Sequence, residues 1–202
     1  MASETNPIMQ RRASCDFPAL YVHTIPSTFN VYFIPSDGSA TIEYANIGTG
    51  KSVFEVPATK YRVVVTNSTA KDRYSLPLYS EVLFLYGENT VDFATAENVD
   101  VTVTNGYSSI MVVKNKTITT VPKFAGVALY DFGTYYNIYY RSESGIATGE
   151  LGLNDYTKKV AVEVKANEVH RFMMCPEDGL NIIVDSNILA AVSNTIIVRK
   201  NG

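Results

Sequence analysis

Apolar and polar residues alternate one by one in the clearest stretches of this chain. Val99-Asp-Val-Thr-Val-Thr104 and Val160-Ala-Val-Glu-Val-Lys165 place a valine at every second position. On a pleated strand, this spacing sends the valines to one face and Asp100, Thr102 and Glu163 to the other. Each stretch therefore predicts an antiparallel strand with one buried and one exposed face.

Short runs of β-branched and aromatic residues recur along the chain, and a helical period of 3.6 residues is almost absent. Turn-forming residues separate many of these runs, for example at 36–38, 87–89, 105–106, 143–145 and 177–179. The pattern is typical of an all-β sandwich or barrel rather than of parallel β-α-β units. Further strands are expected at about residues 19–25, 29–34, 40–44, 52–57, 61–66, 80–86, 108–114, 125–130, 135–141, 145–150, 168–174, 180–184 and 195–199.

The chain also matches itself at an offset of 107 residues. Phe29-Asn-Val-Tyr-Phe33 aligns with Tyr136-Asn-Ile-Tyr-Tyr140, and six of fifteen aligned positions are identical. A duplicated domain explains this match, and a chance likeness between two hairpins of similar composition is the alternative. Because side chains alternate along a strand, one core is expected to receive Phe29, Val31 and Phe33. A second core is expected to receive Tyr136, Ile138 and Tyr140. Their neighbours Tyr32 and Tyr139 then point outward or toward a second layer.

The length of 202 residues admits two units of about 100 residues each. We therefore expect two tandem antiparallel β-sandwich (Ig-like) domains. Residues 1–16 form an N-terminal arm, residues 17–114 the first domain and residues 120–202 the second. The segment 115–123 is the expected connector, and because it is not rich in Gly or Ser it predicts a stiff junction.

Composition fits a globular protein, since 46% of residues are apolar and 18% are charged. Lys and Arg never form a run of three and the net charge is -3, which argues against nucleic-acid binding. The polar start Met1 to Arg12 resembles neither a secretory signal nor a membrane span, so synthesis and retention in the cytoplasm are expected. Cys15 resembles a lipoprotein acylation site but lacks the preceding apolar segment.

The two cysteines, Cys15 and Cys175, lie in opposite halves of the chain. The simplest expectation is two unpaired thiols in a reducing compartment, with a disulfide between the arm and the second domain as the alternative. No Cys-x-x-Cys pair exists, and His23 and His170 lack neighbouring metal ligands. The sequence therefore predicts no metal.

Motifs for catalysis or nucleotide binding are incomplete. Gly48-Thr-Gly-Lys-Ser52 resembles the end of a phosphate-binding loop, but the first glycine of that motif is replaced by Ala45. The residues that follow predict a strand rather than a helix, so a hairpin connection is expected there. His170 lies in a predicted strand without a serine elbow near it. We expect no enzyme activity and no cofactor.

Aromatic residues are concentrated between residues 130 and 140, with a second group at Tyr74, Tyr79, Phe84 and Tyr86. Tyrosine provides flat, amphipathic surface that suits protein contacts or sugar stacking, although alternation places about half of these rings in a core. Core packing, a protein interface and a carbohydrate site all remain open. The candidate interface residues are Tyr130, Phe132, Tyr135 and Tyr139.

Two further stretches carry a resemblance to a known class of module. They are Tyr79-Ser-Glu-Val-Leu-Phe-Leu-Tyr-Gly-Glu-Asn-Thr-Val-Asp-Phe93 followed by Val99 to Thr104, and Phe54-Glu-Val-Pro-Ala58 before Tyr61-Arg-Val-Val-Val65. Residues 19–114 resemble the small Ig-like or prealbumin-like β-sandwich modules of Bacteroidota surface proteins and of virion proteins of their phages. The resemblance implies a sandwich fold and a surface or virion setting, and it transfers no site residues.

Together these features predict a non-enzymatic structural or interaction protein. Because no export signal is recognised, the first expectation is a phage virion component assembled in the host bacterial cytoplasm, such as a head decoration, a neck or tail ring, or a fibre-attachment module. The alternatives are a bacterial surface or fimbria-like adhesin, or a carbohydrate-binding module. Other protein subunits are the expected partners, in a homo-oligomer or larger assembly.

Overall fold

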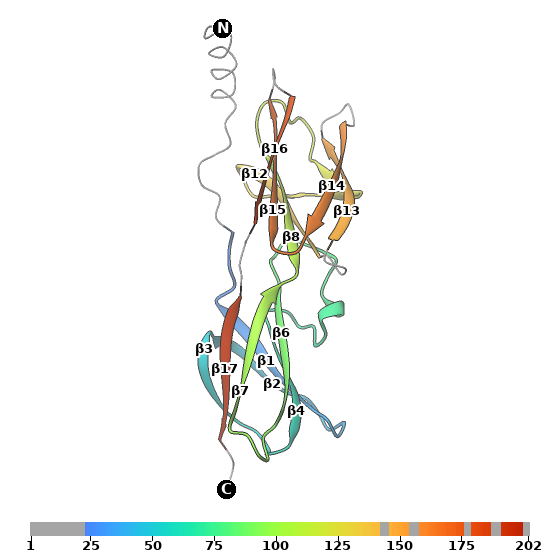
Figure 1. Cartoon of the computed structure of the whole chain (residues 1–202). Helices are drawn as coiled ribbons and strands as arrows, with labels where there is room; N and C mark the ends of the chain where they lie inside the picture. The colour runs from blue at the N-terminus through green and yellow to red at the C-terminus, as the bar shows by residue number, and fades with distance from the viewer. Residues whose placement is uncertain (1–22, 142–145, 154–157, 176–178, 187–190, 200–202) are drawn as a thin grey trace, which may run out of the picture. The chain divides into compact units, whose positions relative to one another are not determined.

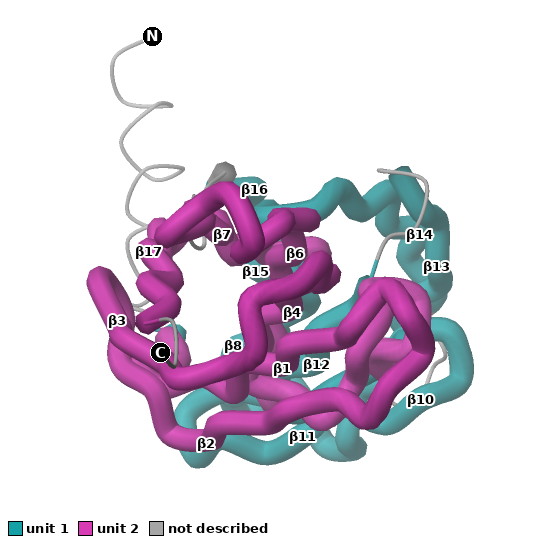
Figure 2. The backbone as a smooth tube through the Cα atoms, turned by 90° about the horizontal axis from the view of Figure 1, so that it is seen from below, with its two compact units in different colours: residues 1–23, 78–81, 107–188 teal, residues 24–77, 82–106, 189–202 magenta. Residues whose placement is uncertain are grey.

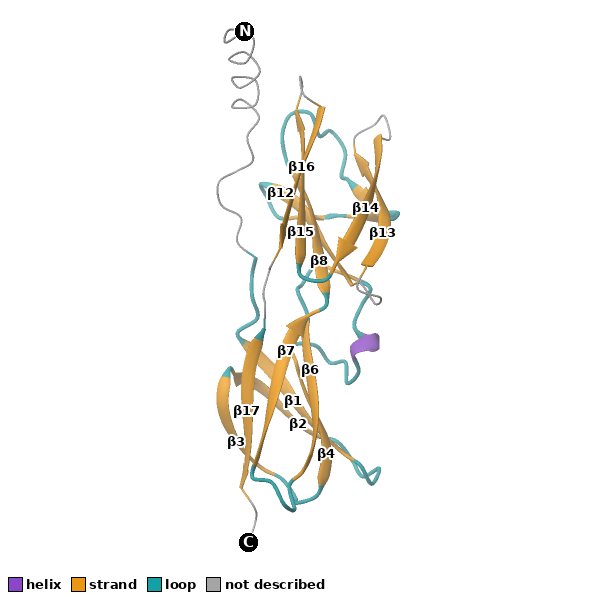
Figure 3. Ribbon diagram, viewed as in Figure 1, coloured by secondary structure: helices purple, strands orange, loops and turns teal. Residues whose placement is uncertain are grey.

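The computed structural model describes residues 23–141, 146–153, 158–175, 179–186 and 191–199. Strands dominate it, and the one helix in these ranges is the single 3₁₀ turn η1, Arg73–Ser75 (Figure 3). The strands form several sheets in a sandwich-like arrangement, so the all-β prediction is confirmed. The expected N-terminal arm, residues 1–16, lies outside the described residues.

The chain divides into two compact units, and both are built from separated segments (Figure 2). Unit 1 contains residues 1–23, 78–81 and 107–188, and unit 2 contains residues 24–77, 82–106 and 189–202. This division differs from the expected tandem domains 17–114 and 120–202. The reason is a C-terminal strand that pairs with strands from the first half of the chain. The expected connector, 115–123, lies inside unit 1.

Unit 2 contains a sheet of seven strands in the order β2-β1-β4-β6-β7-β17-β3 (Figure 1). The C-terminal strand β17 lies antiparallel to β7 and parallel to β3, so it fills the space between them. The strands are β1 (Thr28–Pro35), β2 (Ile42–Gly48), β3 (Gly50–Glu55), β4 (Lys60–Thr66), β6 (Leu85–Asp92), β7 (Asn98–Asn105) and β17 (Val192–Arg199).

This sheet folds over on itself to enclose an aromatic core. The ring of Phe33 on β1 lies 5.3 Å from that of Phe54 on β3 and 5.7 Å from that of Tyr61 on β4. Contact between β1 and β3 is possible only if the β3 end of the sheet packs on the β1 end as a second layer. The buried Tyr61 hydroxyl donates a 2.7 Å hydrogen bond to the Pro57 carbonyl, so its polar atom is satisfied.

Unit 1 has two sheets. A six-stranded sheet has the order β11-β12-β8-β15-β16, with β5 also paired to β12, and a four-stranded sheet has the order β10-β9-β13-β14. The strands are β5 (Tyr79–Ser80), β8 (Tyr107–Val113), β9 (Lys123–Phe124), β10 (Val127–Ala128), β11 (Tyr130–Asp131), β12 (Tyr135–Arg141), β13 (Ile146–Leu153), β14 (Lys158–Lys165), β15 (Glu168–Cys175) and β16 (Gly179–Ser186).

The main core of unit 1 lies between these two sheets. It joins Ile110 and Ile138 of the larger sheet to Phe124, Leu151 and Val164 of the smaller one. Period-two alternation predicted the buried positions correctly in both units. The confirmed buried residues are Val31, Phe33, Val101, Val103, Ile138, Val162 and Val164.

The internal match does not correspond to equivalent strands. Residues 29–33 lie in β1, which pairs with the next strand, β2. Residues 136–140 lie in β12, whereas the next strand, β13, pairs with β14 and β9 in the other sheet. The described topology therefore gives no support to a duplication. The predicted facing is nevertheless correct: Tyr32 lies on the strand face opposite Val31 and Phe33, and its hydroxyl donates to the Ser68 carbonyl in the loop after β4.

Two predicted turns have a different role. Gly87 to Asn89 lies inside β6, where a Cβ at Gly87 would come within 2.2 Å of the Thr102 carbonyl oxygen. Gly87 is needed for close approach of two backbones rather than for a turn. The Gly48–Gly50 connection, expected to close a hairpin, instead joins the two edge strands of the seven-stranded sheet, with Gly50 at a φ of 93°.

Candidate interaction surface

The predicted aromatic cluster is carried by β11, β12 and the turn between them. Tyr130 pairs with Asn137, and the Phe132 amide donates a 2.9 Å hydrogen bond to the Tyr135 carbonyl. Gly133 has a φ of 92°, a conformation that glycine adopts without strain and that closes this short hairpin.

Phe132 and Tyr135 form the exposed part of this cluster. Their rings stack with centroids 5.4 Å apart and an interplanar angle of 6°, and Phe132 is 39% exposed. The two rings cover each other on one side, and Phe132 is the more exposed of the two. The pair is a small apolar platform at the tip of a hairpin.

Lys114 fixes this hairpin from the neighbouring strand. Its amino group lies 2.6 Å from Asp131 Oδ1 and 4.7 Å from the centre of the Tyr136 ring. The hydrogen bond from Lys114, followed by that from the Gly133 amide, lowers the pKa of the Asp131 carboxyl. These contacts order the exposed pair by supporting the strands beneath it.

The other two candidates point inward. Tyr139 is 6% exposed, and its hydroxyl is hydrogen-bonded to His23 Nδ1 at 2.7 Å. Burial raises the pKa of Tyr139 and lowers that of His23 to about 4. Tyr130 packs against the core of unit 1. The structure therefore does not gather the four predicted residues on one exposed surface, and Tyr139 is a packing residue.

The edge strand β16 is a surface that the sequence interpretation missed. It pairs with β15 on one side and ends the six-stranded sheet among the described strands. Ile182 and Val184 share a face with Leu180, which packs on the core, yet they are 48% and 51% exposed. The sequence feature that could have indicated this surface is the run Asn181-Ile-Ile-Val184, which contains no Lys, Arg or Pro.

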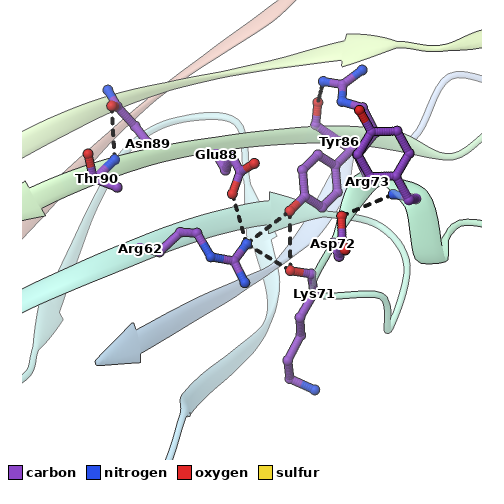
Figure 4. Close-up of polar contacts among 9 residues, drawn as sticks. Arg62, Lys71, Asp72, Arg73, Tyr86, Glu88, Asn89 and Thr90 are labelled. Carbon is purple, nitrogen blue, oxygen red and sulfur yellow. Dashed lines mark hydrogen bonds and ion pairs between the residues drawn. The ribbon is translucent and has the colours of Figure 1, made fainter. Parts of the chain in front are cut away.

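In unit 2, a polar cluster holds the loop after β4 against the sheet (Figure 4). Arg62 donates 2.8 Å hydrogen bonds to the Lys71 carbonyl and to Glu88, and one of 3.3 Å to the Tyr86 hydroxyl. The Arg73 guanidinium lies 5.5 Å from the Tyr86 ring centre. Since Tyr86 is fully buried, this part of the second aromatic group supports the fold.

The described parts of the chain show no side-chain cluster of the kind that binds a metal ion. No group of three or more His, Cys, Asp or Glu side chains there could hold a metal ion. His170 is buried, with Glu168 Oε1 3.6 Å from its Nε2 atom, and burial lowers its pKa. No helix within the described ranges is long and apolar enough to cross a membrane.

The prediction of two unpaired thiols is wrong for Cys175. It is disulfide-bonded, and no cysteine within the described residues is free. Asn181 Nδ2 also donates to its sulfur at 2.8 Å. The chain's other cysteine, Cys15, lies outside the described residues.

Comparison with known proteins adds little to this geometry. No family model matches the sequence. No curated protein matches it either. Among solved structures, a fimbrial assembly protein from Parabacteroides distasonis is similar over 85% of this chain and 92% of its own, with 10% identity and a TM-score of 0.41. That similarity is too low to carry an argument about function, which we base on the chain's own residues.

Proposed function

We propose that this chain is a non-enzymatic structural protein that assembles with other protein chains through the exposed edge of β16. The observation that carries the proposal is an eight-residue edge strand with two half-exposed aliphatic side chains. Exposed edges present unpaired N–H and C=O groups, and soluble proteins usually protect them with charge, proline or a covering segment. Within β16, neither Lys, Arg nor Pro interrupts the run.

A β-strand of a partner chain is the chemistry that fits this edge. Added next to β16, it would form main-chain hydrogen bonds with the strand and cover Ile182 and Val184. The Arg171 to Asp185 ion pair, 2.9 Å long, lies across the β15–β16 pair and keeps its register. An ordered edge reduces the entropy lost on binding.

We place this assembly on the bacterial cell surface, as a fimbria-like or adhesin component, ahead of the virion. The support is the disulfide at Cys175, because disulfides form and persist in oxidising compartments and are rare in the cytoplasm. Alkylation and mass spectrometry of protein taken from its native source without reductant test this setting. A freely alkylated Cys175 would return the virion interpretation to first place.

The assembly itself is tested by substitution of the edge. We expect Ile182→Lys/Val184→Lys to abolish association in size-exclusion chromatography with light scattering and in negative-stain electron microscopy. Val121→Lys is the matched control, since Val121 is 46% exposed but lies outside any strand. A wild-type chain that remains monomeric at its highest soluble concentration would refute the proposal that the β16 edge mediates assembly. Turnover of a glycan or ester would refute the non-enzymatic assignment.

A further inference from the structure

The outer edge of β16 is less protected than the edges at β12 and β14. On the far side of the same sheet, β12 is covered by two short strands, since β11 pairs with residues 136–137 and β5 with residues 139–140. In the smaller sheet, the outermost strand β14 carries lysine at positions 158, 159 and 165. A covering strand prevents further pairing, and lysine opposes it. Within the described residues, β16 has neither form of protection.

We propose that the strand added to this edge is a second β16, so that two copies of the chain pair their β16 strands antiparallel about a two-fold axis at Ile183. The inference rests on the proposed function, because it names the chain that the β16 edge binds. In this register Ile183 lies opposite itself, Ile182 opposite Val184 of the second copy, and Asn181 opposite Asp185 of the second copy. The two six-stranded sheets then continue as one.

The apolar face of β16 is self-complementary in this register. The two-fold axis is perpendicular to the sheet, so each face of one copy continues as the same face of the other. Ile182 and Val184, which are 48% and 51% exposed, are then directly opposite each other on both sides of the axis. Side chains directly opposite on paired strands have Cβ atoms about 4.5 to 5.5 Å apart, close enough to contact. Four half-exposed aliphatic side chains thus cover one another.

The polar face of β16 sets the direction and register of the pairing. In a parallel, in-register pair, Asp185 would lie opposite Asp185, and like charges directly opposite are destabilising. In the antiparallel pair it lies opposite Asn181, whose Nδ2 donates to Cys175 Sγ at 2.8 Å. An amide nitrogen carries two hydrogens, so Asn181 can also donate to the carboxylate of the second copy. A shift of two residues in either direction would place Asp185 opposite a residue without a polar side chain.

Asp185 is already held in position for this contact. Its Oδ2 lies 2.9 Å from Arg171 Nε on the neighbouring strand β15. The ion pair offsets the charge that the carboxylate brings to the interface, and the carboxylate is still 49% exposed at its side chain. Because the same edge is used by both copies, the interface is closed and association through β16 stops at two chains.

Disulfide crosslinking tests the register directly. Directly opposite residues of an antiparallel pair have Cα atoms about 4.5 to 5.5 Å apart, a distance that a disulfide spans. We expect Ile183→Cys, treated with oxidised glutathione, to give a covalent dimer on a non-reducing gel. Ile182→Cys is the matched control, since the same position in the second copy is offset diagonally by about 7 to 8 Å and should crosslink poorly. The wild-type chain controls for crosslinks through the natural cysteines.

A charge substitution tests the polar contact. Asn181→Asp places two carboxylates opposite each other twice in each dimer, so the dissociation constant measured by analytical ultracentrifugation should rise on the order of tenfold. Because this change also removes the bond to Cys175 Sγ, the double variant Asn181→Asp/Asp185→Asn is needed. It restores a carboxylate opposite an amide and should recover much of the affinity. Asn98→Asp, the same change at an exposed position of unit 2, should leave the dissociation constant unchanged.

The outcomes separate this inference from the proposed function. Crosslinking of Ile182→Cys in preference to Ile183→Cys would overturn the register, and an unchanged dissociation constant for Asn181→Asp would overturn the polar contact. Association that Ile182→Lys/Val184→Lys abolishes, but that gives no crosslink at position 183, would overturn self-pairing and leave the β16 edge as the assembly surface. Loss of the wild-type dimer in neither edge variant would overturn both proposals.

Discussion

Truncation of Val101 to alanine is the sharpest test of how the sheet of unit 2 is built. Val101 is 1% exposed on β7, and it pairs with Asn194 of β17. The substitution removes two buried methyl groups, worth about 0.8 kcal/mol each in transfer free energy. The partly relaxed cavity adds to this, so the free energy of unfolding should fall by about 2 to 3 kcal/mol.

Val53→Ala is the matched control, because it makes the same chemical change on the edge strand β3, which is separated from β7 by β17. Val53 is 49% exposed, so its truncation should cost about 0.5 kcal/mol, chiefly in strand propensity. Urea denaturation followed by circular dichroism measures both variants. With a slope of about 1 to 3 kcal/mol/M, the Val101 midpoint should fall by about 1 M. Equal midpoints for the two variants would refute the assignment of faces.

Three further changes probe other parts of the structure. Gly87→Ala should lower the thermal midpoint of unit 2 by several degrees, because its Cβ meets the Thr102 carbonyl; an unchanged midpoint would mean that the backbones separate without cost. His23 has its pKa lowered to about 4 in the folded state, so the unfolded state binds the proton more tightly. Stability should then be present above about pH 6.5 and decline as the pH falls toward 4, and His23→Gln should flatten this profile in urea titrations across that range. Arg62→Met should release the loop that it holds and speed tryptic cleavage after Lys71, whereas equal cleavage rates in the two proteins would show that the cluster does not restrain it.

The local pattern of the chain predicted the strands and their faces well, because period-two alternation depends only on neighbouring residues. Val101, Val103 and Val162 were assigned correctly on that ground alone. The grouping of strands into units was missed, since it depends on a pairing between β3 and β17 that leaves no mark in either strand's own sequence. The strand at Gly87 was missed because a glycine needed for close backbone approach looks like a turn glycine.

The candidate surface was predicted less well. A cluster of aromatic residues in the sequence does not reveal which rings point outward. The exposed Phe132 and the buried Tyr139 therefore looked equivalent. A strand was expected at residues 180–184. Its position at the end of a sheet depends on how the strands pair, which is a property of the topology. Cys175 was misassigned because its bonding depends on a residue distant in sequence, which spacing alone cannot identify.

The insertion of β17 between β3 and β7 affects how the protein is made. Thr195 on β17 donates a hydrogen bond to Asp100 on β7 from 95 residues away, and β3 lies still earlier. At about 5 to 20 residues per second, a ribosome needs about 5 to 20 seconds to pass from one to the other. During that interval the unit begun first lacks the strand that completes it, so the newly made chain keeps two open strand edges until β17 is synthesised. A nonsense mutation or proteolytic cut before β17 would leave the early unit permanently open and prone to aggregation, even though all of its other strands had been made.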